Sequence, residues 1–392
     1  MLIRKLDSGD EVASSKLFAI AYEASTDVTA PQGFGRGPCW GAFEDGVLFS
    51  QMQCLPFKMR FDGQWIPMGG VAGVSTLPQY RRRGGVRALF HRLLEVMRDE
   101  GQVFSVLYPF EFGFYRQFGY EAVYRESRVT IPLSILDRLP KPHSVRFHEP
   151  DDSIEDLNAI YERFVADRGL AVQRPADYWA KRILPGDPYK ERRHTYVIAG
   201  PAGDPCAYFI FSPGSSDQGR SMRIRDWAAA GAEGVKALFG FIGTYRSHFE
   251  TVEFTMPSDL LPDLMMAEYY DVRCSTAWSG MLRVVDVEAA LRLARWPAGQ
   301  GRLVIRVLDD TFDWNNDTFA VTFESGKAAV SRVHEEPDFS ADVRALARML
   351  VGTVGLDEPS AGLIHGLHVA THDMRPLGAL FPRKLTWLND HF

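Results

Sequence analysis

The stretch from Val71 to Tyr120 constrains the fold of this chain more than any other. It predicts, in order, a strand over Val71–Thr76, a basic turn, a helix from about Gly85 to Glu100 and a short apolar strand over Val103–Tyr108. Pro78 ends the first strand, because proline has no N–H to donate to a sheet ladder. This order places the basic turn at the N-terminus of a helix, directly behind a strand.

The turn itself combines two glycines with four arginines: Tyr80-Arg81-Arg82-Arg83-Gly84-Gly85-Val86-Arg87. The first N–H groups of a helix have no partner within the helix and lie at the positive end of its dipole, so they attract anions. Glycine has no Cβ, which lets a phosphate approach the backbone. The turn is too short for a Walker loop and lacks the three glycines of the dinucleotide fingerprint. It therefore predicts a diphosphate site, and an exposed basic turn that binds nothing is the alternative.

The turn and the residues after it resemble a known family. Arg81-x-x-Gly84-x-Val86 resembles the acyl-CoA pyrophosphate loop of GCN5-related N-acetyltransferases (GNAT), although Val86 stands where that superfamily usually has glycine or alanine. The same turn, followed by Phe114-Tyr115-Arg116-Gln117-Phe118-Gly119-Tyr120, resembles the Eis (enhanced intracellular survival) acetyltransferases. In those proteins the third position is also a larger apolar residue. The combination is far more specific than either half.

Residue patterns and the resemblance together predict an α+β fold in three parts. Residues 1–131 have the order of elements of a catalytic GNAT domain, with a mixed, mostly antiparallel sheet and helices on both faces. Residues 132–284 repeat that order, but Ala228–Gly234 replaces the basic turn, so we expect this tandem copy to bind no CoA. Residues 285–392 resemble the sterol-carrier-protein-like third domain of the Eis family.

Residue patterns in the middle of the chain predict a linker and two helices. The prolines of Pro132–Pro142 suggest a linker. Periodic apolar residues predict one helix from about Glu233 to Phe249 and another over Ser258–Met266.

Composition excludes several classes of protein. The net charge of −6, from 44 Lys and Arg against 50 Asp and Glu, argues against a general nucleic-acid-binding protein. No apolar run approaches the ~20 residues needed to span a bilayer, and no signal-peptide pattern follows Met1. The four cysteines lack metal-ligand spacing, so we expect no metal site: Cys39, Cys54, Cys206 and Cys274. A chain of this size needs no disulfides, so we expect these thiols to be reduced and the protein to be cytoplasmic.

The resemblance implies acetyl-CoA as the co-substrate and assigns residues to it. Backbone groups of the first strand are expected to bind the acetyl-pantetheine arm: Val74, Ser75 and Thr76. The basic turn is expected to hold the pyrophosphate: Arg82, Arg83, Gly84, Gly85, Val86 and Arg87. A further pair before the short helix matches CoA contacts of the family, although a small polar residue is usual at the first position: Phe110 and Glu111.

The catalytic groups are also implied by the resemblance. Transfer of an acetyl group to an amine needs a deprotonated amine and a proton donor for the leaving thiolate. The family's general acid is the tyrosine matched by Tyr115, at the start of the short helix, and we interpret Tyr120 as structural. The family's base is the C-terminal α-carboxylate, which here belongs to Phe392. The alternatives are a packed aromatic at Tyr115 and a docked chain end without a catalytic role.

The substrate is the least constrained part. Phe34 and Trp40 flank the loop before the second strand, and similar aromatic residues line the amine cleft of the family. Asp27 is a candidate to attract a cation, and packing or solvated surface is the alternative for each of the three. The resemblance implies direct transfer to primary amines of the aminoglycoside, polyamine or lysine type, in a homohexamer. A longer-chain acyl-CoA N-acyltransferase on the same fold and a non-catalytic sensor of CoA or lipid are the alternative functions.

Overall fold

The computed structural model describes residues 1–24, 37–217, 219–369 and 374–392, which fall into two compact units. Unit 1 comprises Met1–Tyr124, Ser279–Lys384 and Asp390–Phe392. Unit 2 comprises Arg125–Trp278 and Leu385–Asn389. The first and last thirds of the chain therefore share one unit, and the final residues are divided between the two.

The N-terminal part of unit 1 is built on a mixed sheet. Its strands follow one another in the order β1 (Leu2–Lys5), β2 (Cys39–Glu44), β3 (Val47–Phe61), β4 (Gln64–Thr76), β5 (Phe104–Leu107) and β12 (Arg273–Val284). Strands β1 to β4 are antiparallel neighbours, and β5 runs parallel to β4. The turns Asp45-Gly46 and Asp62-Gly63 join β2 to β3 and β3 to β4 with positive φ at all four residues, as expected of tight hairpins.

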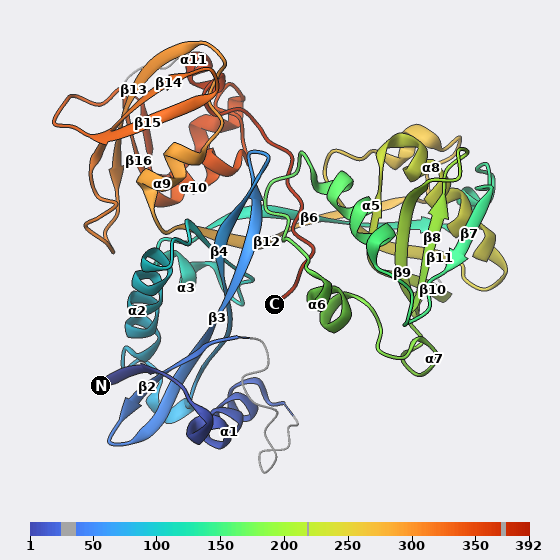
Figure 1. Cartoon of the computed structure of the whole chain (residues 1–392), viewed down its shortest axis with the longest axis horizontal. Helices are drawn as coiled ribbons and strands as arrows, with labels where there is room; N and C mark the ends of the chain where they lie inside the picture. Colours follow the sequence, from blue (N-terminus) through green and yellow to red (C-terminus); the bar gives the residue numbers. More distant parts are fainter. Residues whose placement is uncertain (25–36, 218, 370–373) are drawn as a thin grey trace. The chain divides into compact units, whose positions relative to one another are not determined.

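Two helices cover opposite faces of this sheet (Figure 1). They are α1 (Glu11–Tyr22) and α2 (Gly85–Asp99). Leu48 of β3 packs with Leu17 of α1, whereas the next residue, Phe49, packs with Leu89 and other residues of α2. Successive side chains of a strand point to opposite faces, so the two clusters lie on either side of β3. A short helix, α3 (Phe112–Arg116), follows β5.

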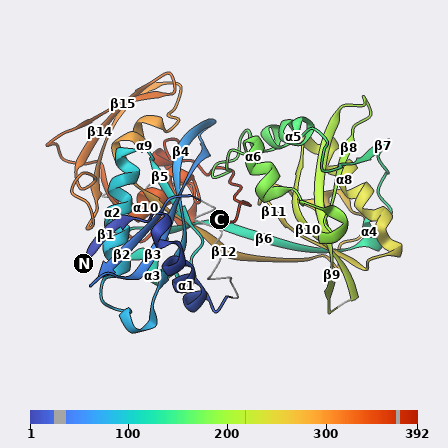
Figure 2. The same ribbon diagram turned by 60° about the horizontal axis from the view of Figure 1, so that its bottom comes forward.

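Unit 2 repeats the pattern of a sheet with a helix on each face. Its strands lie in the order β6 (Glu121–Pro132), β11 (Thr251–Met256), β10 (Gly219–Ala229), β9 (Pro205–Ser216), β8 (His194–Ala199) and β7 (Ser144–Phe147). Helices α5 (Glu155–Val165) and α8 (Gly231–Gly243) cover opposite faces of this sheet (Figure 2). Tyr208 of β9 contacts Trp179, whereas the next residue, Phe209, contacts Phe241 of α8. The helices are α4 (Leu133–Leu136), α5 (Glu155–Val165), α6 (Ala176–Tyr178), α7 (Pro188–Glu191) and α8 (Gly231–Gly243).

The third part of the chain forms a five-stranded sheet within unit 1. Its order is β15 (Lys327–Arg332), β14 (Thr318–Glu324), β13 (Gln300–Leu308), β16 (Phe339–Asp342) and β17 (Leu367–Val369). The helices of this part are α9 (Val287–Leu293), α10 (Val343–Val351) and α11 (Arg375–Gly378). Helix α10 packs on β13 and β16, and α9 packs on β14 and β15.

Two long strands carry the chain from one unit to the other. The first is β6, whose second half pairs with β11 in unit 2. The sequence pattern does not predict β12, whose last residues, Met281–Val284, return to unit 1 and pair with β5. The edge of β5 that faces away from β4 is therefore paired by β12, which is far away in sequence.

The structure corrects three expectations for the middle of the chain. The expected linker contains α4, in which Leu133 and Leu136 are fully buried. The helix expected over Ser258–Met266 is only a 3₁₀ turn, Pro262–Met265, because Pro262 disfavours helical backbone at the residue before it. The helix expected to reach Phe249 ends as an α-helix at Gly243 and continues as a 3₁₀ turn to Ser247.

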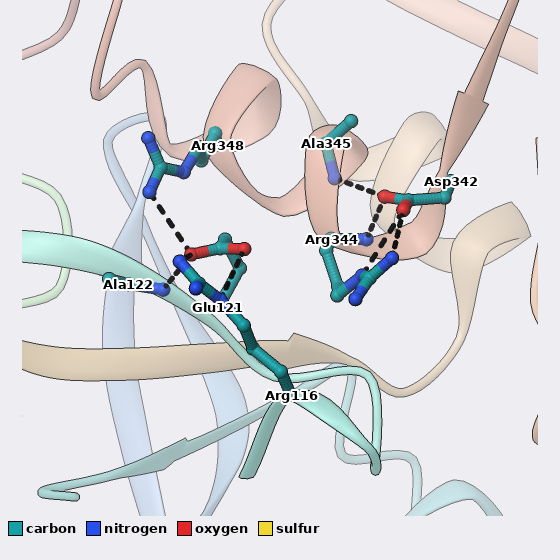
Figure 3. Close-up of polar contacts among 7 residues, drawn as sticks. All are labelled: Arg116, Glu121, Ala122, Asp342, Arg344, Ala345 and Arg348. Atoms are coloured by element: carbon teal, nitrogen blue, oxygen red, sulfur yellow. Dashed lines mark hydrogen bonds and ion pairs between the residues drawn. The ribbon is translucent and has the colours of Figure 1, made fainter. Parts of the chain in front are cut away.

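Within unit 1, charged side chains join α10 to the start of β6 (Figure 3). The Glu121 carboxylate accepts a hydrogen bond from Arg348 Nη2 at 3.0 Å and from Arg116 Nη2 at 2.8 Å. Asp342 begins α10 by accepting the free N–H groups of Arg344 and Ala345. The third part is thus attached to the β6 strand by a partly buried ion-pair network.

Two properties bear on the class of protein. Within the described ranges, no helix is long and apolar enough to cross a lipid bilayer. All four cysteines are free thiols.

Candidate active site

Strands β4 and β5 form a fork. They are paired only from Met68 to Gly70, opposite Phe104 to Val106, and β4 then continues without β5 to Thr76. A bulge interrupts the pairing of β3 with β4 between Gln51 and Gln53, where Gly73 adopts a positive φ of 60°. Bulges and positive φ at glycine bend a strand. The segment Val71–Thr76 therefore leaves β5 with one hydrogen-bonding edge unpaired by any described strand.

Neighbouring side chains fix the backbone of this free edge. The Tyr22 hydroxyl, at the end of α1, donates to the carbonyl of Val74 at 3.0 Å. The Ser50 hydroxyl bonds the carbonyl of Ser75 at 3.1 Å and the hydroxyl of Thr76 at 2.8 Å. The three residues expected to bind the pantetheine arm are thus held in fixed positions. Tyr22 was not predicted as part of the site, because its one local signal is its place four residues after another aromatic residue, Phe18.

The basic turn presents a row of backbone donors. Arg82 has a positive φ of 66° and Gly84, the N-cap of α2, one of 82°. Five N–H groups between positions 82 and 87 have no backbone acceptor in the described part of the chain: those of Arg82, Gly84, Gly85, Val86 and Arg87. Converging N–H groups at a helix N-terminus are a recurrent anion site. The geometry of the turn suits a diphosphate.

The four arginines of the turn differ in their surroundings. Arg83 is exposed, lies 3.1 Å from Glu44 and stacks over Tyr80. Arg87 donates to Gln117 at 3.1 Å. Arg81 and Arg82 are exposed and make no ion pair with any described residue. Two of the arginines are therefore oriented by neighbours, and two are available to an incoming anion.

Gly85 is required by the packing of α2 on the sheet. A Cβ at this position would lie 2.4 Å from Cε2 of Phe49, closer than any side chain can approach. Phe49 in turn stacks on Tyr80 with ring centroids 5.0 Å apart. The missing side chain lets the first turn of α2, and with it the row of N–H donors, lie directly on β3.

Tyr115 lies in the last turn of α3, and not at its start as expected. Its side chain is 4% exposed and packs edge-on against Phe90 and Phe114. No hydrogen bond joins its hydroxyl to another described residue. Burial, and to a lesser degree the neighbouring Tyr22, raises the pKa of Tyr115 well above its ordinary value. The phenol is therefore protonated at neutral pH and free to donate.

Tyr120 has a different environment, which fits the structural role expected of it. Its hydroxyl lies 2.6 Å from the Ser105 hydroxyl, which donates to the Gly69 carbonyl at 3.0 Å. The side chain is fully buried, and burial raises its pKa. Tyr120 thus supports Ser105, whose hydroxyl joins β5 to β4 at the base of the fork.

The C-terminal residue lies at the fork. The Phe392 ring is 5.0 Å from that of Phe57 and 5.5 Å from that of Tyr108, which follows β5. A Cβ on Gly70, the last residue of β4 paired with β5, would lie 2.9 Å from the Phe392 ring. The absence of that side chain leaves room for Phe392. The Tyr108 hydroxyl donates to the Asp390 carbonyl at 3.1 Å.

The remaining candidates are placed as follows. Phe110 is 72% exposed, with its ring 5.4 Å from that of Tyr115, and Glu111 precedes α3 on the surface. Trp40 of β2 is half-buried against the cluster under α2, with the Arg92 guanidinium 5.7 Å from its ring. Asp27 and Phe34 lie outside the described residues.

The corresponding turn of unit 2 lacks these features. Helix α8 begins at Gly231, and Lys236 on its second turn is paired with Glu233 at 2.8 Å. In the described ranges, no group of three or more histidine, cysteine, aspartate or glutamate side chains is arranged to hold a metal ion.

Family models match three consecutive segments of the chain. Residues 2–123 match an acetyltransferase (GNAT) domain, residues 170–284 match a second acetyltransferase (GNAT) domain, and residues 287–389 match a sterol carrier protein domain.

Similar proteins are found by sequence and by structure. An uncharacterized N-acetyltransferase of Streptomyces avermitilis is 26% identical over 319 residues, covering 75% of this chain and 74% of that protein. The N-acetyltransferase Eis of Mycobacterium tuberculosis is 25% identical over 309 residues, covering 73% and 71%. Eis1 from Mycobacterium abscessus has a TM-score of 0.80 at 24% identity and covers both chains completely. A probable N-acyltransferase of Enterococcus faecalis has a TM-score of 0.87 at 20% identity, covering 100% and 99%.

These matches confirm the expected α+β fold, with two GNAT domains followed by a sterol carrier protein domain. The chain is an Eis-like N-acetyltransferase of the GNAT family, with two GNAT domains followed by a sterol carrier protein domain.

Proposed function

We propose that this protein transfers an acetyl group from acetyl-CoA directly to a primary amine, with Tyr115 as the general acid and the α-carboxylate of Phe392 as the general base. One observation carries the proposal: the free edge of β4 has the Phe392 ring at one end and the basic turn beyond the other. The six residues Val71–Thr76 span about 20 Å at roughly 3.3 Å per residue. An extended thioester arm can lie along them, with its pyrophosphate on the N–H groups of the turn.

The reaction balances with these groups alone. The amine nitrogen attacks the thioester carbonyl carbon, and its proton passes to the Phe392 carboxylate, directly or through one water molecule. The C–S bond then breaks, and the Tyr115 hydroxyl donates a hydrogen bond to the developing thiolate. A phenol is a weaker acid than the CoA thiol, whose pKa is about 8–9. Tyr115 therefore stabilises the sulfur during bond cleavage. The proton taken up by the Phe392 carboxylate then passes through solvent to the thiolate, so that CoA leaves as the thiol and the carboxylate is regenerated.

The carboxylate suits a cationic substrate. An α-carboxyl group ordinarily titrates at about 3.3–3.7 and is charged at neutral pH, so it attracts an ammonium as well as accepting its proton. By resemblance to the Eis relatives, the substrates are primary amines of the aminoglycoside, polyamine or lysine type. Phe110, exposed beside Tyr115, and Glu111 are proposed CoA contacts. For Trp40 the packing under α2 favours a structural role over contact with the amine.

A thiol-release assay tests the proposal. Acetyl-CoA is mixed with the enzyme and a panel of polyamines, aminoglycosides and lysine peptides, and a series of longer acyl-CoAs runs beside it. Tyr115→Phe should lower kcat while acetyl-CoA affinity stays the same. Extra residues fused after Phe392 should abolish turnover and leave acetyl-CoA binding unchanged. Full activity in either variant would show that the altered residue is not the proposed acid or base. Faster thiol release from long acyl-CoAs than from acetyl-CoA would show that a longer acyl-CoA is the donor.

The assembly, the location and the limits of the domains also belong to the proposal. We expect a cytoplasmic homohexamer, by resemblance to the family, with domains at 1–131, 132–284 and 285–392. Light scattering of the purified protein measures the number of subunits.

A further inference from the structure

The segment Leu385–Asn389, just before the C-terminus, is part of unit 2. It runs beside Gly169 as a short parallel bridge: the Gly169 N–H donates to the Leu385 carbonyl at 2.8 Å, and the Trp387 N–H donates to the Gly169 carbonyl at 2.9 Å. Both bonds are between backbone groups, so they hold the direction of the segment whatever its side chains are.

Trp387 anchors this segment in the core of unit 2. Its side chain is fully buried, with ring centroids 5.6 Å from Phe164 of α5 and 6.2 Å from Trp227 of β10. A buried tryptophan of this kind removes a large apolar area from water, about 150–250 Å². The segment is therefore docked as an integral element of the unit and does not lie loosely on its surface.

A buried polar network holds Asn389, two residues after Trp387. The Asn389 amide donates to Asp226 Oδ1 at 3.0 Å. Asp226 also accepts a hydrogen bond from Tyr208 at 2.7 Å and a bidentate pair from Arg174, at 2.8 and 3.1 Å. Arg174 and Asp226 are almost completely buried. Arg174 and Tyr208 thus fix both oxygens of the Asp226 carboxylate independently of Asn389, so Asn389 binds to a rigid acceptor.

From this docking we infer that unit 2 acts as the anchor of the C-terminal segment, and that Asn389, through Asp226, is a positioning residue for the α-carboxylate of Phe392. The inference rests on the proposed role of that carboxylate as the base. It gives the second GNAT domain a task that needs no CoA, in agreement with the absence of a basic turn before α8.

The length of the free chain sets the size of the effect. Three residues beyond Asn389 can reach at most about 10 Å, whereas eight residues beyond Lys384, which Asp62 holds at 2.8 Å in unit 1, can reach about 28 Å. The volume open to the carboxylate grows with the cube of that reach. Loss of the anchor therefore lowers the effective concentration of the carboxylate at the site, and hence kcat, and about 20-fold is the upper limit because Tyr108 still bonds the Asp390 carbonyl.

Asn389→Asp is the sharpest test, because it keeps the size of the side chain and places a second carboxylate against Asp226. Asn316→Asp is the matched control: it makes the same chemical change at an exposed position where the neighbour is Arg306, at 2.9 Å. Trp387→Ala is the second variant, which removes the apolar part of the anchor. Asp226 itself is left intact, since its removal would leave the buried Arg174 charge unbalanced.

Two measurements are made on the full-length protein: the rate at which carboxypeptidase releases Phe392, followed by mass spectrometry, and the kcat and KM for acetyl-CoA and for the amine. We expect Asn389→Asp and Trp387→Ala to speed the release of Phe392 by about tenfold or more and to lower kcat by up to about 20-fold. The KM for acetyl-CoA should stay at the wild-type value, which a general loss of structure would not allow. Asn316→Asp should match the wild type in both measurements.

The possible failures are distinguishable. If the tail is released faster but kcat is unchanged, while residues fused after Phe392 abolish turnover, the carboxylate is the base and the anchoring role of unit 2 is wrong. If the fused enzyme is fully active, the proposed base fails and the positioning role fails with it. If carboxypeptidase releases Phe392 from Asn389→Asp and wild type at the same rate, Asp226 does not hold the tail.

Discussion

The Tyr108 hydroxyl donates a hydrogen bond to the backbone carbonyl of Asp390 at 3.1 Å, so the residue that follows β5 holds the chain two residues before its end. The same ring contacts His391 at 4.5 Å and Phe392 at 5.5 Å. The backbone bond and the ring contacts restrain different parts of the last three residues. Tyr108 therefore contributes to both the position and the orientation of the chain end, in addition to the docked segment Leu385–Asn389.

Tyr108→Phe should lower kcat by about fivefold and leave acetyl-CoA affinity unchanged. The substitution removes the hydrogen bond, whose net contribution is about 1 kcal/mol, and keeps the ring that packs against Phe392. Steady-state kinetics and calorimetry measure the two effects. Tyr189→Phe is the control, because Tyr189 is 67% exposed in unit 2. An unchanged kcat in Tyr108→Phe would mean that ring packing alone places the chain end.

Arg82→Ala should weaken acetyl-CoA binding by about tenfold to about a hundredfold, because a hydrogen bond to a charged group contributes about 1.5–3 kcal/mol. Arg82 is exposed, has a φ of 66° and makes no ion pair in the described part of the chain. Calorimetry at two salt concentrations tests this, and the deficit should shrink at high salt. Arg138→Ala, an exposed arginine in unit 2, should bind normally. Equal affinity of wild type and Arg82→Ala would place the pyrophosphate elsewhere.

Gly85→Ala should destabilise unit 1 and weaken acetyl-CoA binding at the same time. The added Cβ would lie 2.4 Å from the Phe49 ring, and overpacking of this kind costs about 1–3 kcal/mol. Thermal unfolding and calorimetry on the same variant measure both effects. Gly113→Ala in α3 is the control, since the nearest atom to its Cβ is 3.8 Å away. A Gly85→Ala protein with normal Tm and affinity would contradict the close contact of α2 with β3.

Local signals in the sequence predicted the framework of the site. The Asp-Gly turns fix the pairing of β2, β3 and β4, and the glycine-arginine turn fixes the start of α2, because each depends on residues next to one another in the chain. The short helix containing Tyr115 was also predicted, although Tyr115 lies at its end.

Long-range relationships were not predictable from such signals. Strand β12 pairs with β5, more than 170 positions earlier, and carries the fully buried Arg283, a residue type that usually marks a surface. Its charge is balanced by Asp309, which Asn315 also contacts at 3.0 Å. The spacing of apolar residues indicates which side chains share a buried face, but not which element packs against that face. The docking of Trp387 and the contact of Tyr22 with Val74 are of the same kind.

The ion-pair network at Glu121 should make the stability of unit 1 depend on pH. Burial raises the pKa of Glu121, but the hydrogen bond from Arg116, the Ala122 N–H and the charge of Arg348 lower it by more, so its pKa in the folded protein lies below the ordinary 4.5. A carboxyl group with a lowered folded pKa contributes stability above its unfolded pKa, and this contribution is lost as the pH falls through the folded value.

Glu121→Gln should therefore lower the Tm at pH 7, where the lost hydrogen bonds to charged groups contribute about 1–3 kcal/mol. The difference from wild type should shrink below about pH 4.5 and vanish once the wild-type carboxyl group is protonated as well. Thermal unfolding between about pH 3 and pH 8 measures this. Glu95→Gln, at an exposed pair with Arg92, should change the Tm little at any pH. A constant difference between Glu121→Gln and wild type over that range would show that packing, and not charge, joins α10 to β6.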